Sequence, residues 1–257
     1  MIKRSLFVAC LSLVAVATFA QEKIKDVRTN PDLYFLRADE VASSLNLLPA
    51  PPQPGSILFM NDEAQYKWGK LQRNTPRGDQ AAEDARVNGD GVPNAFSEAF
   101  GVRISATTTP EIYKLVLGMR EDAGDLATRE AKVHYMRVRP FAFYNEMTCN
   151  PEQQELSTNG SYPSGHTAIG WATALVLAEI NVDRQNEILK RGYEMGQSRV
   201  ICGYHFQSDV DAARLVASAV VARLHANENF MKQLEKAKKE FAELVSKGQV
   251  AKSDFKN

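Results

Sequence analysis

Three short segments of this 257-residue chain carry side chains suited to chemistry on an anion. The first is KVHYMRVRP, in which Lys132 and Arg139 lie seven residues apart. On a helix this spacing places the two residues about 20° apart around the axis and about 10 Å apart along it, so both could reach one point. Pro140 disfavours helix at Arg139, which is therefore expected at the end of the segment. The alternative is a pair of solvated cations on a surface helix.

The second segment is GSYPSGHT, which precedes GWATALVLAEI, an apolar run of helical length. Ser164 is a natural N-cap, and Gly165 lets the backbone turn with no side chain in the way. Free N–H groups at a helix start, with the positive end of the dipole behind them, form a binding site for an anion. The alternative is a capped turn with His166 on the surface.

The third segment, SRVICGYHFQSD, contributes Arg199, His205 and Asp209. If the chain is helical from His205, Asp209 lies one turn further on and can accept a proton from one imidazole nitrogen. That bond would leave the other nitrogen free and basic, as a nucleophile requires. The alternative is a surface His–Asp pair.

Together the three segments supply the groups needed for phosphoryl transfer without a metal ion or another cofactor. The chain has four histidines, and the two that are given no chemical role, His134 and His225, are assigned to packing or the surface. The stretch DARVNGDGVPN, residues 84–94, faintly resembles a calcium loop. Because Arg86 occupies a ligand position, we interpret it as a turn and expect no metal site.

The first twenty residues have two cations, an apolar run and small residues at the end, which is typical of a cleaved export signal. We therefore expect the protein in the periplasm, without its first twenty residues. A membrane anchor is the alternative, although the run is shorter than the ~20 residues of a spanning helix. Lipidation at Cys10 fits less well, because most of the apolar run follows it. No later segment is apolar enough to span a membrane.

Charge and cysteine content narrow the partners further. The chain has 31 basic and 31 acidic residues, so no overall field favours nucleic acid or an anionic membrane. After removal of the signal, Cys149 and Cys202 are the remaining cysteines. In an oxidising compartment a disulfide between them is the default expectation, and it would join two of the three segments.

The pattern of apolar residues predicts an all-α fold in one domain, residues 58–257, preceded by a proline-containing arm, residues 21–57. The last predicted helix is amphipathic and is expected to cover the core or to form an oligomer contact. The predicted helices are 58–73, 77–87, 110–118, 123–138, 165–179, 183–197, 206–226 and 228–247.

The three segments read K-x6-RP, PSGH and SR-x5-H-x3-D, which resembles the signature of the PAP2-type phosphatase superfamily. That superfamily includes lipid phosphatases and vanadium haloperoxidases. GSYPSGHT, EDAGDLATR (121–129), RPFAFYN (139–145), ILKRGYEMGQSRVICGYH (188–205) and QSDVDAAR (207–214) further resemble the class A bacterial nonspecific acid phosphatases. The resemblance runs from about Gly55 to the last helix and implies a helical bundle of that family's type.

The resemblance also implies a role for each of the eight signature residues in the three segments. His205 would attack phosphorus and form a phosphohistidine, Asp209 would orient it, and His166 would act as general acid and then as base. The phosphate-binding groups would be Lys132, Arg139, Ser164, Gly165 and Arg199. The implied substrates are small phosphomonoesters, with inhibition by vanadate, possible transfer of phosphate to another alcohol, and possible self-association.

Other readings use the same residues. A vanadate-dependent haloperoxidase would bind vanadate at His205, but such enzymes are usually longer. A membrane-lipid phosphatase would need spanning helices beside the motifs. An exported helical phosphate-binding module would have no need of a His–Asp pair beside a second histidine.

Overall fold

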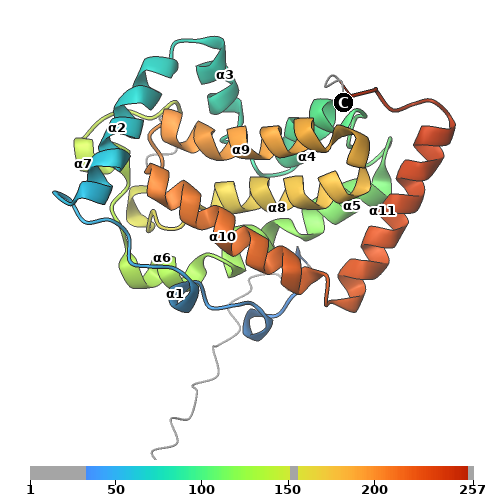
Figure 1. Ribbon diagram of the computed structural model, residues 1–257, viewed down its shortest axis with the longest axis horizontal. Coiled ribbons are helices and arrows are strands. Elements are labelled where there is room, and N and C mark those ends of the chain that lie inside the picture. The colour runs from blue at the N-terminus through green and yellow to red at the C-terminus, as the bar shows by residue number, and fades with distance from the viewer. Residues whose placement is uncertain (1–32, 151–155, 254–257) are drawn as a thin grey trace, which may run out of the picture.

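The computed structural model describes residues 33–150 and 156–253, and the predicted signal peptide lies outside these ranges. Every regular element in the described part is helical, which confirms the all-α prediction (Figure 1). None of those helices combines the length and the apolar character that a membrane span requires. The longer helices are α2 (Ile57–Gln72), α3 (Pro76–Glu83), α4 (Gly91–Phe100), α5 (Pro110–Gly118), α8 (Gly165–Ile180), α9 (Gln185–Ile201), α10 (Gln207–Leu224) and α11 (Glu228–Ser246).

Helix α8 is the centre of the bundle, between α9 and α10 (Figure 1). Its sequence is apolar on nearly every side, and Ala168, Ala172 and Leu177 are fully buried. A helix that is apolar all round is stable only when neighbours cover it on every side. The first turn of α8 is the GSYPSGHT segment, so the most buried helix of the fold presents the middle part of the predicted site.

Small residues bring α8 and α9 close together. A Cβ placed on Gly192 would overlap the Cβ of Ala174, and one placed on Gly170 would lie 2.9 Å from Sδ of Met195. Glycine is therefore needed at both contacts, because larger residues would push the helices apart. This packing fixes the C-terminal end of α9, where Arg199 lies, against α8.

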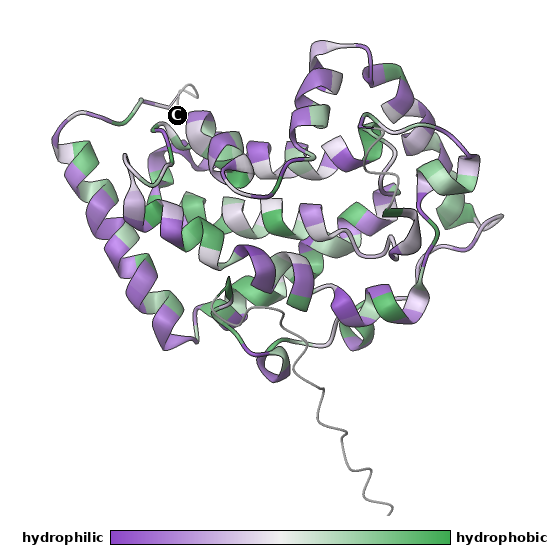
Figure 2. Cartoon of the chain, turned by 180° about the vertical axis from the view of Figure 1, so that it is seen from behind, coloured by the Kyte–Doolittle hydropathy of each residue, from purple (hydrophilic) through white to green (hydrophobic). Residues whose placement is uncertain are grey.

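Helix α11 packs on α5 at the edge of the bundle, far from α2 and α3 (Figure 1). Phe230 and Leu234 are fully buried, whereas hydrophilic and hydrophobic residues alternate along the helix (Figure 2). The amphipathic pattern of this helix therefore serves to cover the core, one of the two roles predicted for it.

Helix α4 was not predicted from the sequence. The turn expected at 84–94 ends at Asp90, and a helix begins at Gly91. Val92, Phe96 and Phe100 lie at four-residue intervals and are fully buried. Gly91 and Pro93 in the first turn, which indicated a loop, obscured this apolar stripe.

The segment from residue 33 to the start of α2 has little regular structure beyond η2 (Ala38–Glu40) and α1 (Ser44–Leu47). It nevertheless contributes to the core, because Leu36 and Leu48 are buried in the main hydrophobic cluster. The backbone N–H groups of Phe35 and Leu36 each donate to the buried carboxylate of Asp122, at 3.0 Å. The described part of the arm therefore packs on the domain.

Candidate active site

The segment KVHYMRVRP departs from the predicted single helix 123–138. A π-helical turn, η3 (Asp122–Leu126), precedes α6 (Arg129–Tyr135), and Met136 then adopts left-handed backbone geometry with φ 39°. Arg139 is extended, as expected for a residue before Pro140, where α7 (Pro140–Tyr144) begins. The prediction that Lys132 and Arg139 share one helix face is therefore wrong.

Lys132 and Arg139 still meet, by another route. Nζ of Lys132 donates to the carbonyl oxygen of Gly160 at 3.1 Å, and Nη2 of Arg139 donates to the same oxygen at 3.4 Å. Burial, followed by the charge of Arg139, lowers the pKa of Lys132 to about 7. Burial also lowers the pKa of Arg139 to about 10. Two positively charged side chains thus lie close together in a partly desolvated region. A bound anion would reduce the repulsion between them.

The start of α8 matches the prediction for GSYPSGHT. Ser164 is the N-cap, fully buried, and its Oγ accepts hydrogen bonds from N of Thr167 at 3.3 Å and from Oγ1 of Thr167 at 2.9 Å. A Cβ on Gly165 would lie 2.8 Å from the carbonyl oxygen of Gly124 in η3. Glycine therefore permits the close approach of two backbones at the start of this helix.

His166 follows in the same turn and is half-buried. Its Nε2 lies 3.1 Å from the carbonyl oxygen of Ala85, just after α3. Burial, followed by the charge of Arg199, lowers the pKa of His166 well below its ordinary value. The imidazole is consequently neutral in the protein without an anion, and a negatively charged ligand would favour its protonation.

Arg199 lies near the end of α9 and is fully buried. Its guanidinium is 3.9 Å from the centre of the Tyr204 ring, yet none of its three nitrogens has a hydrogen-bond partner within the described residues. Burial lowers the pKa of Arg199 to about 9. A buried charge without a hydrogen-bonded partner is costly, which points to a negatively charged ligand as its partner.

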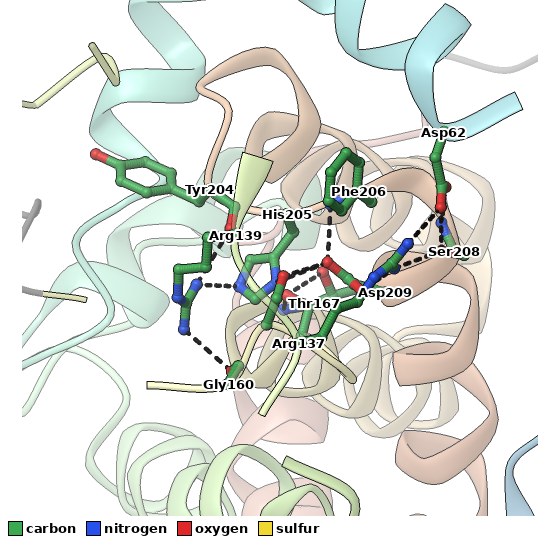
Figure 3. Close-up of polar contacts among 12 residues, drawn as sticks. Asp62, Arg137, Arg139, Gly160, Thr167, Tyr204, His205, Phe206, Ser208 and Asp209 are labelled. Carbon is green, nitrogen blue, oxygen red and sulfur yellow. Dashed lines mark hydrogen bonds and ion pairs between the residues drawn. The ribbon is translucent and has the colours of Figure 1, made fainter. Parts of the chain in front are cut away.

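His205 lies in the turn between α9 and α10 and is also buried. Its Nε2 is 3.0 Å from Nη1 of Arg139, while its Nδ1 is 3.3 Å from Oγ of Ser161 and 3.5 Å from Oδ2 of Asp209 (Figure 3). Helix α10 begins at Gln207 and not at His205. The contact of His205 with Asp209 therefore arises from the capping turn and not from helical spacing.

The charge state of His205 suits a nucleophile. Burial, followed by the positive charges of Arg139, Lys132 and Arg199, lowers the pKa of His205 well below its ordinary value. With Nδ1 facing acceptors, the proton of the neutral ring belongs on Nδ1 and the lone pair on Nε2. That lone pair accepts a hydrogen bond from Nη1 of Arg139, on the side where a phosphate could be held.

The structure adds Arg137, Asp62 and Ser161 to the site. Arg137 donates to Asp209 and Asp62 (Figure 3). The hydroxyl of Ser161 also donates to Asp209, through a short hydrogen bond. In the extended segment RVR, Arg137 and Arg139 fall on the same side, so an alternating reading could have identified Arg137. Asp62, on α2, has no comparable signal.

An open cavity of about 530 Å³ lies at the start of α8. Lys132, Gly165 and His166 line it, as do Glu121 and Arg129 from the segment before and within α6. It offers room for a small organic group attached to a phosphate that contacts Lys132 and His166. Among the described residues, no cluster of histidine, cysteine, aspartate or glutamate is arranged to hold a metal ion.

Cys149 and Cys202 form a disulfide, which joins the segment after α7 to the end of α9. Arg73, the C-cap residue of α2, connects the same two segments. It donates through Nη1 to the carbonyl oxygen of Met147 at 2.8 Å, and through Nε to that of Ile201 at 2.7 Å. One covalent and one non-covalent link therefore hold the end of α9, which carries Arg199, against the segment that follows Arg139.

Comparison with known proteins agrees with this geometry. The family described as "PAP2 superfamily" matches residues 116–230. A "Non-specific acid phosphatase" of Providencia stuartii is 62% identical over 245 residues, covering 94% of this chain and 99% of that protein. A protein of the same description from Salmonella typhimurium is 43% identical over 207 residues, covering 80% and 83% of the two chains. An "Acid phosphatase" of Zymomonas mobilis is 35% identical over 195 residues, covering 75% and 73%.

The matched family region contains all eight of the predicted catalytic and phosphate-binding residues, from Lys132 to Asp209. The match to the Providencia protein also extends over nearly the whole of both chains. The chain therefore belongs to the class A bacterial nonspecific acid phosphatases of the PAP2 superfamily and is a phosphatase.

Proposed function

We propose that this acid phosphatase hydrolyses small phosphate monoesters through a phosphohistidine at His205. The observation that carries the proposal is the buried Arg199 guanidinium, whose three nitrogens have no hydrogen-bond partner within the described residues. It lies close enough to His166 and His205 to lower the pKa of both. A phosphoryl group placed among these side chains would satisfy Arg199 and lie next to Nε2 of His205.

The reaction proceeds in two steps, phosphorylation of His205 and hydrolysis of the phosphohistidine. In the first, Nε2 of His205 bonds to phosphorus, the bond from phosphorus to the ester oxygen breaks, and His166 gives its proton to that oxygen. In the second, His166 takes a proton from water, the resulting hydroxide bonds to phosphorus, and the bond to Nε2 breaks. Lys132, Arg139 and Arg199 stabilise the charge on the oxygens of the transferring group throughout.

The two histidines need different charge states, and their surroundings can provide them. The lowered pKa of His205 keeps Nε2 free at mildly acidic pH. The pKa of His166 is low only while the site lacks an anion, and the negative charge of a bound ester favours the protonated ring. Activity is therefore expected at mildly acidic to neutral pH. A phosphorylation rate that is flat from pH 5 to 9 would contradict these roles.

Hydrolysis of p-nitrophenyl phosphate in the presence of EDTA tests the proposal. We expect activity to survive EDTA, to be blocked by vanadate, and to disappear in His205→Ala. His225→Ala is the matched control, because that imidazole contacts Glu179 and Val221 at a distance from the site. Full activity of His205→Ala would overturn the mechanism. Oxidation of bromide by peroxide after vanadate loading would favour a haloperoxidase instead.

We further propose that the chain is exported to the periplasm with residues 1–20 as its signal. The Cys149–Cys202 disulfide supports this, because such bonds persist in oxidising compartments. Cell fractionation and N-terminal sequencing provide the test. A mature protein that starts near Gln21 in the periplasmic fraction is expected, and a cytoplasmic protein that retains residue 1 would contradict the proposal.

Two other properties belong to the same proposal. The cavity beside His166 has room for an alcohol, so transfer of phosphate from His205 to an added alcohol should compete with hydrolysis. Exposed apolar residues on α2, including Ile57 and Leu71, favour self-association. Product analysis with an alcohol in excess tests the first property, and sedimentation at several protein concentrations tests the second.

A further inference from the structure

The carboxylate of Asp209 divides its contacts between two directions (Figure 3). Its Oδ2 accepts hydrogen bonds from N of Phe206 at 2.8 Å and from the hydroxyl of Ser161, and it lies 3.5 Å from Nδ1 of His205. Its Oδ1 faces away from the imidazole and pairs with Nη1 of Arg137 at 2.5 Å. The orientation of the oxygen that faces His205 therefore depends on what holds the other oxygen.

Arg137 is held on both sides of its guanidinium. Nη1 donates to Asp209 and also to Oγ of Ser208 at 2.7 Å, whereas Nη2 donates to Oδ2 of Asp62 at 2.7 Å. The guanidinium lies 4.5 Å from the centre of the Phe206 ring, and its side chain is only 8% exposed. These hydrogen bonds and the Phe206 ring hold the planar guanidinium in one position. Arg137 therefore fixes the position of Oδ1 of Asp209.

Asp62 completes the arrangement from α2. It is fully buried, and its Oδ1 accepts from N of Ser208 at 2.8 Å while its Oδ2 accepts from Oγ of Ser208 at 2.7 Å. Asp62 therefore binds both Arg137 and the first turn of α10, which carries Asp209. One guanidinium thus lies between two buried carboxylates, from helices that are far apart in the sequence (Figure 3).

We propose that Arg137, fixed by Asp62, is a positioning residue for phosphoryl transfer: it holds Asp209 so that His205 keeps its proton on Nδ1 and presents Nε2 to phosphorus. This inference rests on the proposed role of His205 as nucleophile. Arg137 does not reach the phosphate in this arrangement, because both of its terminal nitrogens are bound to carboxylates. It differs in this respect from Arg139 and Arg199.

A positioning role predicts a loss of rate with little loss of substrate binding. For Arg137→Met we expect kcat to fall roughly 10- to 100-fold, the loss typical when a partner that orients a histidine is removed. KM for p-nitrophenyl phosphate and the Kd of inorganic phosphate should change less than about threefold, since Lys132, Arg139 and Arg199 remain. Arg137→Lys restores the charge but not the two-sided fork, and should recover only part of kcat.

The matched control is Arg223→Met, which removes another arginine–carboxylate pair that involves α10, the one with Glu40 at 2.7 Å. It should lower thermal stability and leave kcat unchanged. Asp62→Asn provides an independent test from α2, with a smaller loss of kcat and the same unchanged KM. If Arg137→Met does not fold, Asp62→Asn and Arg137→Lys carry the comparison.

The decisive measurement is the rate of phosphoenzyme formation in rapid-quench experiments, scaled to the folded fraction. A slower phosphorylation step in the Arg137 and Asp62 variants, with unchanged phosphate affinity, supports the inference. Wild-type phosphorylation rates in folded Arg137→Lys and Asp62→Asn would overturn it. Failure of the wild-type protein to form any phosphoenzyme would instead contradict the proposed function, so the two failures are distinguishable.

Discussion

Arg137 and Arg199 are both buried arginines of the same site, and their surroundings are opposite. Arg137 lies between the carboxylates of Asp62 and Asp209, whereas the three guanidinium nitrogens of Arg199 have no hydrogen-bond partner within the described part of the chain. A paired guanidinium contributes to the architecture of the protein, while an unpaired one is available to a ligand. The comparison teaches that arginine content alone does not define a phosphate site; it matters whether carboxylates of the protein already pair with the guanidinium, as they do with Arg137.

The largest effect on stability is expected at Arg137, the arginine that is paired with carboxylates. Arg137→Met leaves two buried carboxylates facing each other without a cation, and we expect a loss of about 3–5 kcal/mol in the free energy of unfolding. Urea unfolding followed by circular dichroism measures it. A loss below about 1 kcal/mol would mean that the two carboxylates find other partners, and the comparison with Arg199 would fail.

The opposite pattern is expected for Arg199→Met. If Arg199 stabilises the transition state as proposed, its removal should lower kcat/KM about 10²- to 10³-fold. The free energy of unfolding should fall by no more than about 1 kcal/mol, because the guanidinium stabilises the fold mainly by stacking on the Tyr204 ring. Steady-state kinetics and urea unfolding on the same preparation test both statements. A loss of several kcal/mol would show that Arg199 is structural.

His166 and His205 should make the stability of the fold depend on pH. The pKa values of His166 and His205 are lower in the folded protein than in the unfolded chain, so the unfolded chain binds more protons below its ordinary value of about 6.5. Stability is therefore complete above that pH and falls as the pH decreases through the window below it. Thermal unfolding from pH 7 to pH 5 measures this, and His205→Gln should weaken the dependence. An unchanged slope would contradict the assignment.

The smallest effect is expected at the cap of α8. Ser164→Ala removes the acceptor for N of Thr167 and should cost about 1 kcal/mol of stability. If Ser164 also contacts phosphate, the Kd of inorganic phosphate should rise in the same variant. Thr167→Val is the control, because it removes the other hydroxyl of the pair and keeps the cap. Equal phosphate affinity in the wild type and Ser164→Ala would limit Ser164 to capping.

Local signals in the sequence predicted the parts of the site that depend on local structure. Ser164 and Gly165 begin a helix because a capping residue and a glycine precede an apolar run, and Pro140 fixes the extended geometry of Arg139. The way Lys132 meets Arg139 was predicted wrongly, since the left-handed turn at Met136 has no signature in the sequence. The two converge on Gly160, a residue of a different segment.

Contacts between segments far apart in the sequence could not be predicted from local sequence patterns. Asp62 reaches Arg137 across 75 residues and Ser208 across 146 residues, and nothing in the sequence of α2 marks it as part of the site. Helix α4 was missed for a related reason, because its first turn has loop-forming residues while its apolar stripe faces the core. Tertiary packing, which local pattern does not record, decided both outcomes.

The disulfide and Arg73 join the same two segments, and this duplication has a consequence for how long the folded enzyme survives. A disulfide acts largely on the unfolded chain, by limiting how far its ends can separate, whereas the hydrogen bonds of Arg73 exist only in the folded protein. Reduction should therefore leave turnover nearly intact while it shortens the time the protein survives proteases and heat. The disulfide thus determines mainly how long the protein survives, whereas the hydrogen bonds of Arg73 maintain the geometry of the folded enzyme. Selection could adjust one property without altering the other.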